Sequence, residues 1–436
     1  MEHGPDTSNL DRKRITLFWL PLAATWFMMS AEGPFITALI ARLGEAKYNL
    51  AAFGVAFSLA LIVEAPIIMI MSASTALVKD AEAFRKLRRF TYALNTLITA
   101  VMGVLLLPPV FTLLAEKAIG LPPEVARITH LATLLLLPWP AAIGYRRFYQ
   151  GILIRRDLTR RVAYGTVVRL CGMSVSGYAC YRLLPLPGAC IGAAALSFGV
   201  LLEAAASRWM ARGMVRDFRA EAAAAEAPHA GSIRYREIAS FYLPLALTSI
   251  LTLAVTPIVT FFLGRSRFAL ESLAVLPVVH SFTFIFRCVG ISYQEACVAL
   301  LGERFEGRAV LAGFGRIMGS CATGALAVVA FTPLARLWFT HVSGLTPDLA
   351  DFALLPLAIL VLMPALEVLL SFQRALLIGQ RRTRFVTWAT GIEVGGLLVV
   401  LALVLRGLDW PGVVGAATAI LSGRLMAIAF LQRKLK

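Results

Sequence analysis

The chain has 436 residues, of which 59% are hydrophobic and only 15% are charged, and its mean hydropathy is +0.77. Soluble globular proteins carry about 25% charged and roughly 45–50% apolar residues, so this balance excludes a soluble enzyme, a disordered chain and a secreted disulfide scaffold. The apolar runs, such as residues 131–138, are continuous rather than alternating, which argues against a transmembrane β-barrel. We therefore expect an all-α polytopic membrane protein with about 12 transmembrane helices.

The helices are predicted from continuous apolar segments and from the charged, Gly and Pro residues that separate them. They lie near residues 15–41, 50–78, 89–115, 127–153, 161–183, 188–212, 238–263, 270–301, 310–333, 350–378, 384–405 and 412–432.

The net charge of +17 is concentrated on one side of the predicted spans. With a cytoplasmic N-terminus, the inner loops and tails hold 28 Lys and Arg residues, whereas the outer loops hold nine. Such a bias over short loops is a strong positive-inside signal. We expect both termini in the cytoplasm, an integral location in the plasma (bacterial inner) membrane, contacts with anionic lipid, and no nucleic-acid partner.

The longest connection divides the chain into two similar halves. A shift of 223 places Trp19 on Tyr242 and Pro34 on Pro257, and a shift of 224 places Pro140 on Pro364. We therefore expect an N-lobe at 1–212, a cytoplasmic linker at 213–237 and a C-lobe at 238–436, related as pseudo-symmetric six-helix lobes. Because each half has an even number of spans, the repeats are parallel, an arrangement typical of transporters with a substrate site between the halves.

Ionisable residues inside the predicted spans are the main functional signal. The acids are Glu32, Glu64, Glu203, Glu295, Glu367 and Glu393, and the bases are Arg146, Arg147, Arg169, Arg287 and Arg424. Each would cost about 2.5–3.5 kcal/mol on the lipid face, so most must face the protein interior or a water-filled cavity. They either bind a substrate or coupling ion, or form structural ion pairs, and the sequence leaves both interpretations open.

When the two halves are aligned by the repeat, some of the acidic residues of one half fall on basic residues of the other. Glu64 corresponds to Arg287 and Arg169 to Glu393. Glu203 comes within two positions of matching Arg424, and we expect this last pair to form ion pairs between or within the lobes.

We expect the basic residues Arg147, Arg169 and Arg287, with Gln294, to bind the substrate. Adjacent helical residues point about 100° apart, so only one of Arg146 and Arg147 can face a narrow cavity, and the polar stripe through Gln150 favours Arg147.

The predicted ion-coupling or gating residues are Glu32, Glu64, Glu295, Glu367, Glu393 and His280. Pro34 and Pro66 follow two of these acids closely, which predicts helix kinks at the cavity. A buried packing role is the alternative for His280.

No nucleotide-hydrolysis motif, zinc motif or Ser/His/Asp constellation is visible, so we expect no enzyme, no metal site and no cofactor. A proton or sodium gradient is the expected driving force. Gly391 and Gly395 form a GxxxG motif, which predicts close helix packing.

Several segments resemble the progressive ankylosis (ANK) protein family, within the multidrug/oligosaccharidyl-lipid/polysaccharide (MOP, MATE-like) exporter superfamily. The matching segments are residues 50–59 (LAAFGVAFSL), 151–153 (GIL), 241–247 (FYLPLAL), 257–259 (PIV) and 412–416 (GVVGA), with an acid at Glu32. The resemblance implies two six-helix lobes and secondary-active export of small anions such as citrate, pyrophosphate and nucleotides. Residues 254–256 (AVT) stand where that family has a basic residue, so the substrate need not be the same.

Together these features predict a monomeric secondary-active exporter that works by alternating access on a small organic or phosphate-containing anion. A MATE-type multidrug/cation antiporter and a flippase for lipid-linked precursors remain the alternatives.

Overall fold

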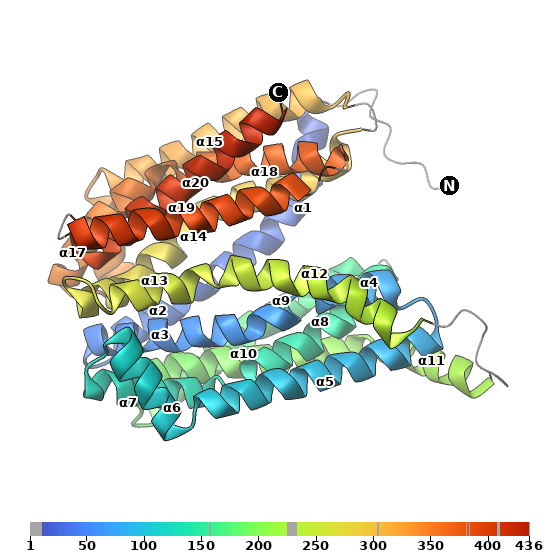
Figure 1. Cartoon of the computed structure of the whole chain (residues 1–436), viewed down its shortest axis with the longest axis horizontal. Coiled ribbons are helices and arrows are strands. Elements are labelled where there is room, and N and C mark those ends of the chain that lie inside the picture. The colour runs from blue at the N-terminus through green and yellow to red at the C-terminus, as the bar shows by residue number, and fades with distance from the viewer. Residues whose placement is uncertain are drawn as a thin grey trace. The chain divides into compact units, whose positions relative to one another are not determined.

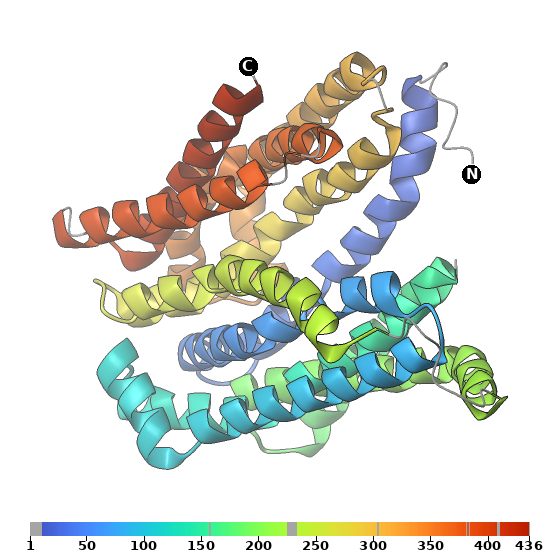
Figure 2. The ribbon, with the colours of Figure 1, turned by 45° about the vertical axis from the view of Figure 1, so that its right-hand side comes forward.

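The computed structural model describes residues 11–156, 158–224, 233–302, 305–380, 382, 384–407 and 410–435. The described chain is built of helices and forms two compact units (Figures 1 and 2). We call Leu43–Phe261 the middle unit, and Met1–Arg42 with Phe262–Lys436 the terminal unit.

The middle unit contains α3 (Ala46–Glu64), η2 (Ala65–Ile67), α4 (Ile70–Leu77), α5 (Ala81–Leu105), α6 (Pro108–Thr112), η3 (Leu113–Ile119), α7 (Pro123–Leu135), α8 (Trp139–Arg155), α9 (Thr159–Leu183), α10 (Gly188–Met210), α11 (Arg212–Ala224) and α12 (Tyr235–Leu253). The boundary between the units falls within α13 (Val255–Leu263).

The terminal unit contains α1 (Arg12–Ser30), α2 (Glu32–Ala41), α14 (Ala269–Leu300), α15 (Arg308–Ala330), α16 (Leu334–Leu337), η4 (Trp338–Val342), α17 (Pro347–Ile359), η5 (Leu360–Leu362), α18 (Met363–Gly379), α19 (Arg384–Gly407) and α20 (Gly412–Leu435). Within it, α19 and α20 run side by side (Figures 1 and 2).

By length and composition, ten helical stretches of the described chain could cross a membrane, or eleven if the bent pair 81–105 and 108–119 is one span. The predicted all-α, multi-span fold class is confirmed. The remaining predicted span corresponds to α9, which has 25 residues but is too polar to pass the same test.

The third predicted helix, 89–115, was placed too late in the chain. Asp80 accepts a hydrogen bond from the Ala83 N–H and caps α5, so the basic segment after Lys79 forms the first turns of that helix rather than a loop. The chain then bends by 72° before Pro108, which begins the next helix.

The first helix of each predicted lobe packs in the compact unit formed mainly by the other half. Trp19 of α1 donates a hydrogen bond to Ser292 of α14 at 2.8 Å. Tyr242, its partner in the repeat, donates to the carbonyl of Pro66 in η2. The compact units thus differ from the predicted 1–212 and 238–436 lobes by the exchange of these two helices.

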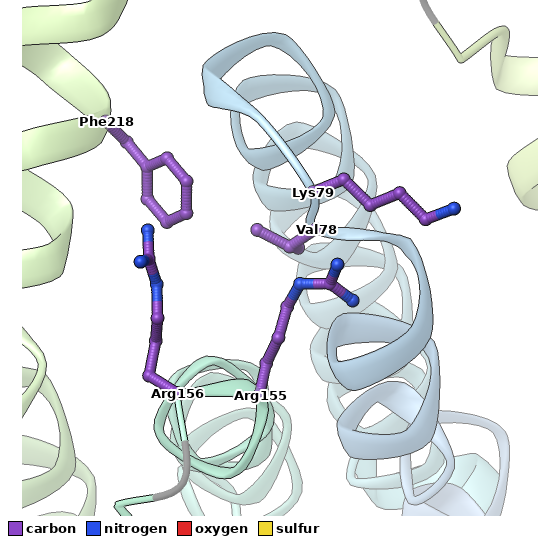
Figure 3. Close-up of a pocket in the computed structure, with 5 residues that line it drawn as sticks. All are labelled: Val78, Lys79, Arg155, Arg156 and Phe218. Carbon is purple, nitrogen blue, oxygen red and sulfur yellow. The ribbon is translucent and has the colours of Figure 1, made fainter. Parts of the chain in front are cut away.

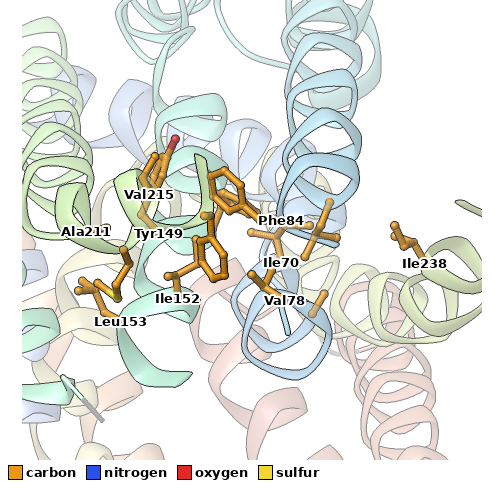
Figure 4. Close-up of a cluster of buried hydrophobic side chains, with 14 of the residues drawn as sticks. Ile70, Val78, Phe84, Tyr149, Ile152, Leu153, Ala211, Val215 and Ile238 are labelled. Atoms are coloured by element: carbon orange, nitrogen blue, oxygen red, sulfur yellow. The ribbon is translucent and has the colours of Figure 1, made fainter. Parts of the chain in front are cut away.

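A cluster of buried apolar side chains joins five helices of the middle unit near the connection between α4 and α5. Tyr149, Ile152, Phe84, Val215 and Ile238 belong to one cluster that joins α4, α5, α8, α11 and α12 (Figure 4). Because α11 contributes its apolar face to this cluster, the predicted linker is a packed part of the unit over Arg212–Ala224.

The close contact between α19 and α20 involves Gly396 rather than the predicted Gly391 and Gly395. A Cβ added at Gly391 or Gly395 would meet nothing within 4 Å in the described chain. The close approach is instead at Gly423, where a Cβ would lie 2.5 Å from the carbonyl oxygen of Glu393, and at Gly396, where it would meet Met426. Periodicity alone could not distinguish the two faces of α19.

Candidate functional site

The buried carboxylate of Glu203 forms the centre of an ion-pair network in the middle unit. Glu203 of α10 is completely buried and pairs with Arg146 of α8. Gln150, one turn after Arg146, donates to the second carboxylate oxygen at 3.1 Å, and Arg169 Nε of α9 lies 3.5 Å from the first. Three helices therefore meet at one charge, which is stable in a low-dielectric interior because opposite charges surround it.

Small residues allow the helices to approach this centre closely. A Cβ at Gly199 of α10 would lie 2.9 Å from the carbonyl oxygen of Arg169, and one at Gly165 would contact the Glu203 side chain. The glycines thus let α9 and α10 pack at a distance that brings Arg169 within reach of Glu203.

Arg147 differs from its neighbour Arg146. It is half-buried and takes part in no ion pair among the described residues, whereas Arg146 is buried and pairs with Glu203. The Nε atoms of both arginines are buried without a hydrogen-bond partner in that part of the chain. The carboxylates of Glu64 and Glu203 both act on Arg147 electrostatically. Arg146 thus belongs to the ion-pair network around Glu203, and Arg147 remains the predicted substrate-binding residue.

At the helix break beside Glu64, backbone carbonyl groups accept hydrogen bonds from side chains of α12. Glu64 ends α3 and is 3% exposed, and the break follows at η2. Ser249 donates to the carbonyl of Ala65 at 2.6 Å, and Tyr242 donates to that of Pro66. These bonds from α12 replace intrahelical bonds that the proline break removes.

A chain of alternating charges forms the polar centre of the terminal unit. Arg287 Nε and Nη2 lie 3.0 and 2.8 Å from Glu367 Oε2, and Arg424 Nη1 lies 2.8 Å from Glu367 Oε1. Arg424 Nε also lies 2.8 Å from Glu393 Oε1, and Arg374 Nη2 lies 3.8 Å from the other oxygen of Glu393. Gly290 permits the close approach of α14 and α18 beside Glu367.

The two centres have inverted charge. In the middle unit a glutamate on α10 lies between arginines of α8 and α9, whereas in the terminal unit Arg424 on α20 lies between glutamates of α18 and α19. The opposite signs in the sequence repeat thus correspond to two networks, each formed within its own unit. In each network arginines outnumber glutamates by one.

The other predicted residues lie outside these networks. Glu32 is half-buried at the start of α2, directly after the break at Ala31, where Gly33 packs against Ser281 of α14. His280 and Glu295 of α14 are exposed, Gln294 is half-buried, and Glu295 accepts a hydrogen bond from Trp26. Among the described residues, no group of three His, Cys, Asp or Glu could hold a metal ion.

Two members of the networks were missed by the sequence analysis. Gln150 was recognised only as part of a polar stripe, although its spacing of four from Arg146 places both on one helix face. Arg374 is not among the ionisable residues selected from the sequence, although it lies in α18 beside Glu393.

Solved structures with similar folds were found for nearly the whole chain. An inward-facing MATE family multidrug resistance transporter of the MOP superfamily superposes with a TM-score of 0.71 at 15% identity, over 94% of each chain. The lipid II flippase MurJ in an inward closed conformation gives 0.72 at 12% identity, over 95% of this chain and 87% of that one.

A third similar structure is a MOP superfamily transporter from Pyrococcus furiosus, described as having a binding pocket of reversed polarity. Its TM-score is 0.63 at 15% identity, over 100% of this chain and 98% of that one. No protein-family profile and no curated protein matches the sequence. The narrower likeness to the ANK family stays a prediction. At these identities the comparisons establish the fold, and the chain has the fold of the MATE-type transporters of the MOP superfamily.

Proposed function

We propose that the protein is a secondary-active membrane transporter that works by alternating access and exports a small organic or phosphate-containing anion. Arg147 carries the proposal, because it is a half-buried cation outside the ion pairs of the described chain, with a buried N–H that makes no hydrogen bond there. A guanidinium binds carboxylate or phosphate with two parallel hydrogen bonds, so an anionic substrate fits it chemically.

The charge balance supports the same substrate class. Each buried network has one more arginine than glutamate, and Arg147 and Glu64 add one charge of each sign to the middle unit. Excess positive charge in a low-dielectric region attracts anions and repels cations.

Glu64 is the proposed coupling residue of the middle unit. It is buried, it lies at a helix break, and it acts electrostatically on Arg147. A proton or sodium ion that neutralised Glu64 would leave Arg147 more available to an anion, so the two sites would be linked through charge. Arg169 and Arg287, paired with Glu203 and Glu367, are proposed to organise the helices or to change partner during transport.

Flux measurements in proteoliposomes test the substrate class. Labelled citrate, labelled pyrophosphate and a cationic dye are assayed with imposed proton and sodium gradients, and a fluorescent lipid-linked pyrophosphate is assayed for transbilayer movement. Gradient-dependent citrate or pyrophosphate flux is the expected result. Dye flux alone would support the multidrug antiporter, and lipid movement alone would support the flippase.

A further inference from the structure

A small basic cavity lies in the middle unit, between the connection from α4 to α5, the end of α8 and α11. None of its lining residues belongs to the ion-pair network around Glu203. The cavity has a volume of about 280 Å³ and is lined by Val78, Lys79, Arg155, Arg156 and Phe218 (Figure 3). Three of these residues are cationic and none is acidic. We propose that this cavity is a binding site for a phosphate group, carried either by an anionic phospholipid headgroup or by a soluble ligand.

The fold holds both arginines in place. Arg155 Nη1 donates to the carbonyl oxygens of Thr75 and Ala76 at 2.8 and 3.4 Å, which are at the C-terminal end of α4. The guanidinium has five N–H groups, so this anchoring through one nitrogen leaves the others for a ligand. An anchored guanidinium loses less conformational entropy when it binds phosphate than a mobile one does.

Arg156 is held by an aromatic surface. Its guanidinium carbon lies 5.8 Å from the centre of the Phe218 ring, and Phe218 stacks on Phe84 at 5.1 Å. In Figure 3, Arg155 and Arg156 extend from the end of α8 in the same direction, Arg156 toward Phe218, while Lys79 lies on the Arg155 side. The two guanidiniums thus present adjacent positive groups at the cavity, and Lys79 forms its rim.

Two acids of the described chain near the cavity, Asp80 and Glu221, interact with the start of α5. Asp80 accepts the Ala83 N–H at 2.8 Å, and the Ala81 N–H points at Glu221 Oε1 of α11 at 3.5 Å. Neither acid lines the cavity. Their carboxylates are stabilised by the N-terminus of α5.

The three cations are not repeated at the matching positions of the second half. In the repeat register Lys79 matches Gly302, and Arg155 and Arg156 match Gly379 and Gln380. A Cβ at Gly379 would lie 3.0 Å from Leu301 and 3.2 Å from Phe305, so apolar side chains fill the equivalent place. The fold therefore does not require three cations here, which favours a role in binding.

The cavity is suited in depth and size to a phosphate-bearing group. Trp209, 62% exposed at the end of α10, stacks with Arg212 at 4.7 Å, and exposed tryptophans mark the level of lipid headgroups. Arg212 begins α11, the helix that contributes Phe218 to the cavity. The volume is just below the roughly 300–1,000 Å³ of drug-sized ligand sites, as expected for a headgroup or a diphosphate.

Two binding measurements separate the possible sources of the phosphate. Both use the full-length chain carrying Arg147→Gln, so that the proposed transport site contributes no signal and the result does not depend on transport. In one, sodium pyrophosphate is titrated calorimetrically into protein in phosphatidylcholine nanodiscs. In the other, native mass spectrometry counts phosphatidylglycerol molecules retained from nanodiscs of mixed phosphatidylcholine and phosphatidylglycerol.

The test variant is Lys79→Gln/Arg155→Gln/Arg156→Gln, and the matched control is Arg308→Gln/Arg316→Gln/Arg433→Gln, which removes three exposed cations elsewhere. We expect the test variant to bind pyrophosphate at least about tenfold more weakly, or to retain less phosphatidylglycerol, with the control unchanged. Because Arg155 also supports α4, Lys79→Gln and Arg156→Gln are measured singly, and we expect the same direction. If the test variant and the control behave alike in both measurements, the proposal is wrong.

Discussion

Arg146 and Arg147 are adjacent on α8, yet the first pairs with the fully buried Glu203 and the second takes part in no ion pair of the described chain. The 100° rotation between neighbouring helical residues accounts for this division. Arg146 joins helices of the bundle through Glu203, and Arg147 is the residue proposed to bind the anion.

Removing the carboxylate of Glu203 should strongly destabilise the middle unit. Glu203→Leu would leave Arg146 and Arg169 buried without their counter-charge, and breaking a buried pair in this way costs about 3–5 kcal/mol. We expect a large fall in the thermal unfolding temperature in detergent. The double variant Arg146→Met/Glu203→Leu should be less destabilised than the sum of the single variants, because it removes both charges of the pair. Strict additivity would contradict a direct interaction.

Gly290→Ala should destabilise the terminal unit. The new Cβ would lie 2.7 Å from the backbone nitrogen of Val368, so α14 and α18 must move apart beside Glu367. Overpacking of this kind costs about 1–3 kcal/mol. Gly313→Ala is the matched control, since nothing in the described chain lies within 4 Å of its added Cβ. Thermal unfolding should rank the two variants in that order, and equal unfolding temperatures would exclude the close helix contact.

Tyr242→Phe and Trp19→Phe should have similar, moderate effects on stability. Tyr242→Phe removes the donor to the Pro66 carbonyl and Trp19→Phe removes the donor to Ser292, and a lost hydrogen bond costs roughly 0.5–1.5 kcal/mol. Tyr178→Phe, at a tyrosine that is 63% exposed, provides the control for removing a hydroxyl. If both variants unfold at the temperature of the control, these contacts do not stabilise the exchanged helices.

Much of the fold could be predicted from the sequence because membrane spans are governed by one dominant property, a continuous apolar length. The predicted helices at 188–212 and 270–301 lie within a few residues of α10 and α14. The start of α5 was missed because charged residues continue the helix beyond its apolar part, where the cap at Asp80 sets its beginning. The packing of α1 with α14 could not be predicted, since hydropathy carries no information about which apolar face meets which.

The buried charges could be identified from the sequence, but their partners could not. Opposite signs at Arg169 and Glu393 suggested a relation between the halves, whereas the structure pairs each of them within its own unit. Pairing depends on helix rotation and on close approaches at small residues such as Gly199. The repeat gives only the depth of each charge along its helix.

The most direct test of the account is the initial rate of gradient-driven citrate and pyrophosphate flux by proteoliposomes containing Arg147→Gln. Arg147→Lys, which keeps the charge but loses the planar fork, is the companion variant. We predict that Arg147→Gln is as stable as the unmodified chain but loses at least about tenfold in anion flux, with partial recovery in Arg147→Lys. Unchanged flux in a correctly folded Arg147→Gln protein would contradict the account.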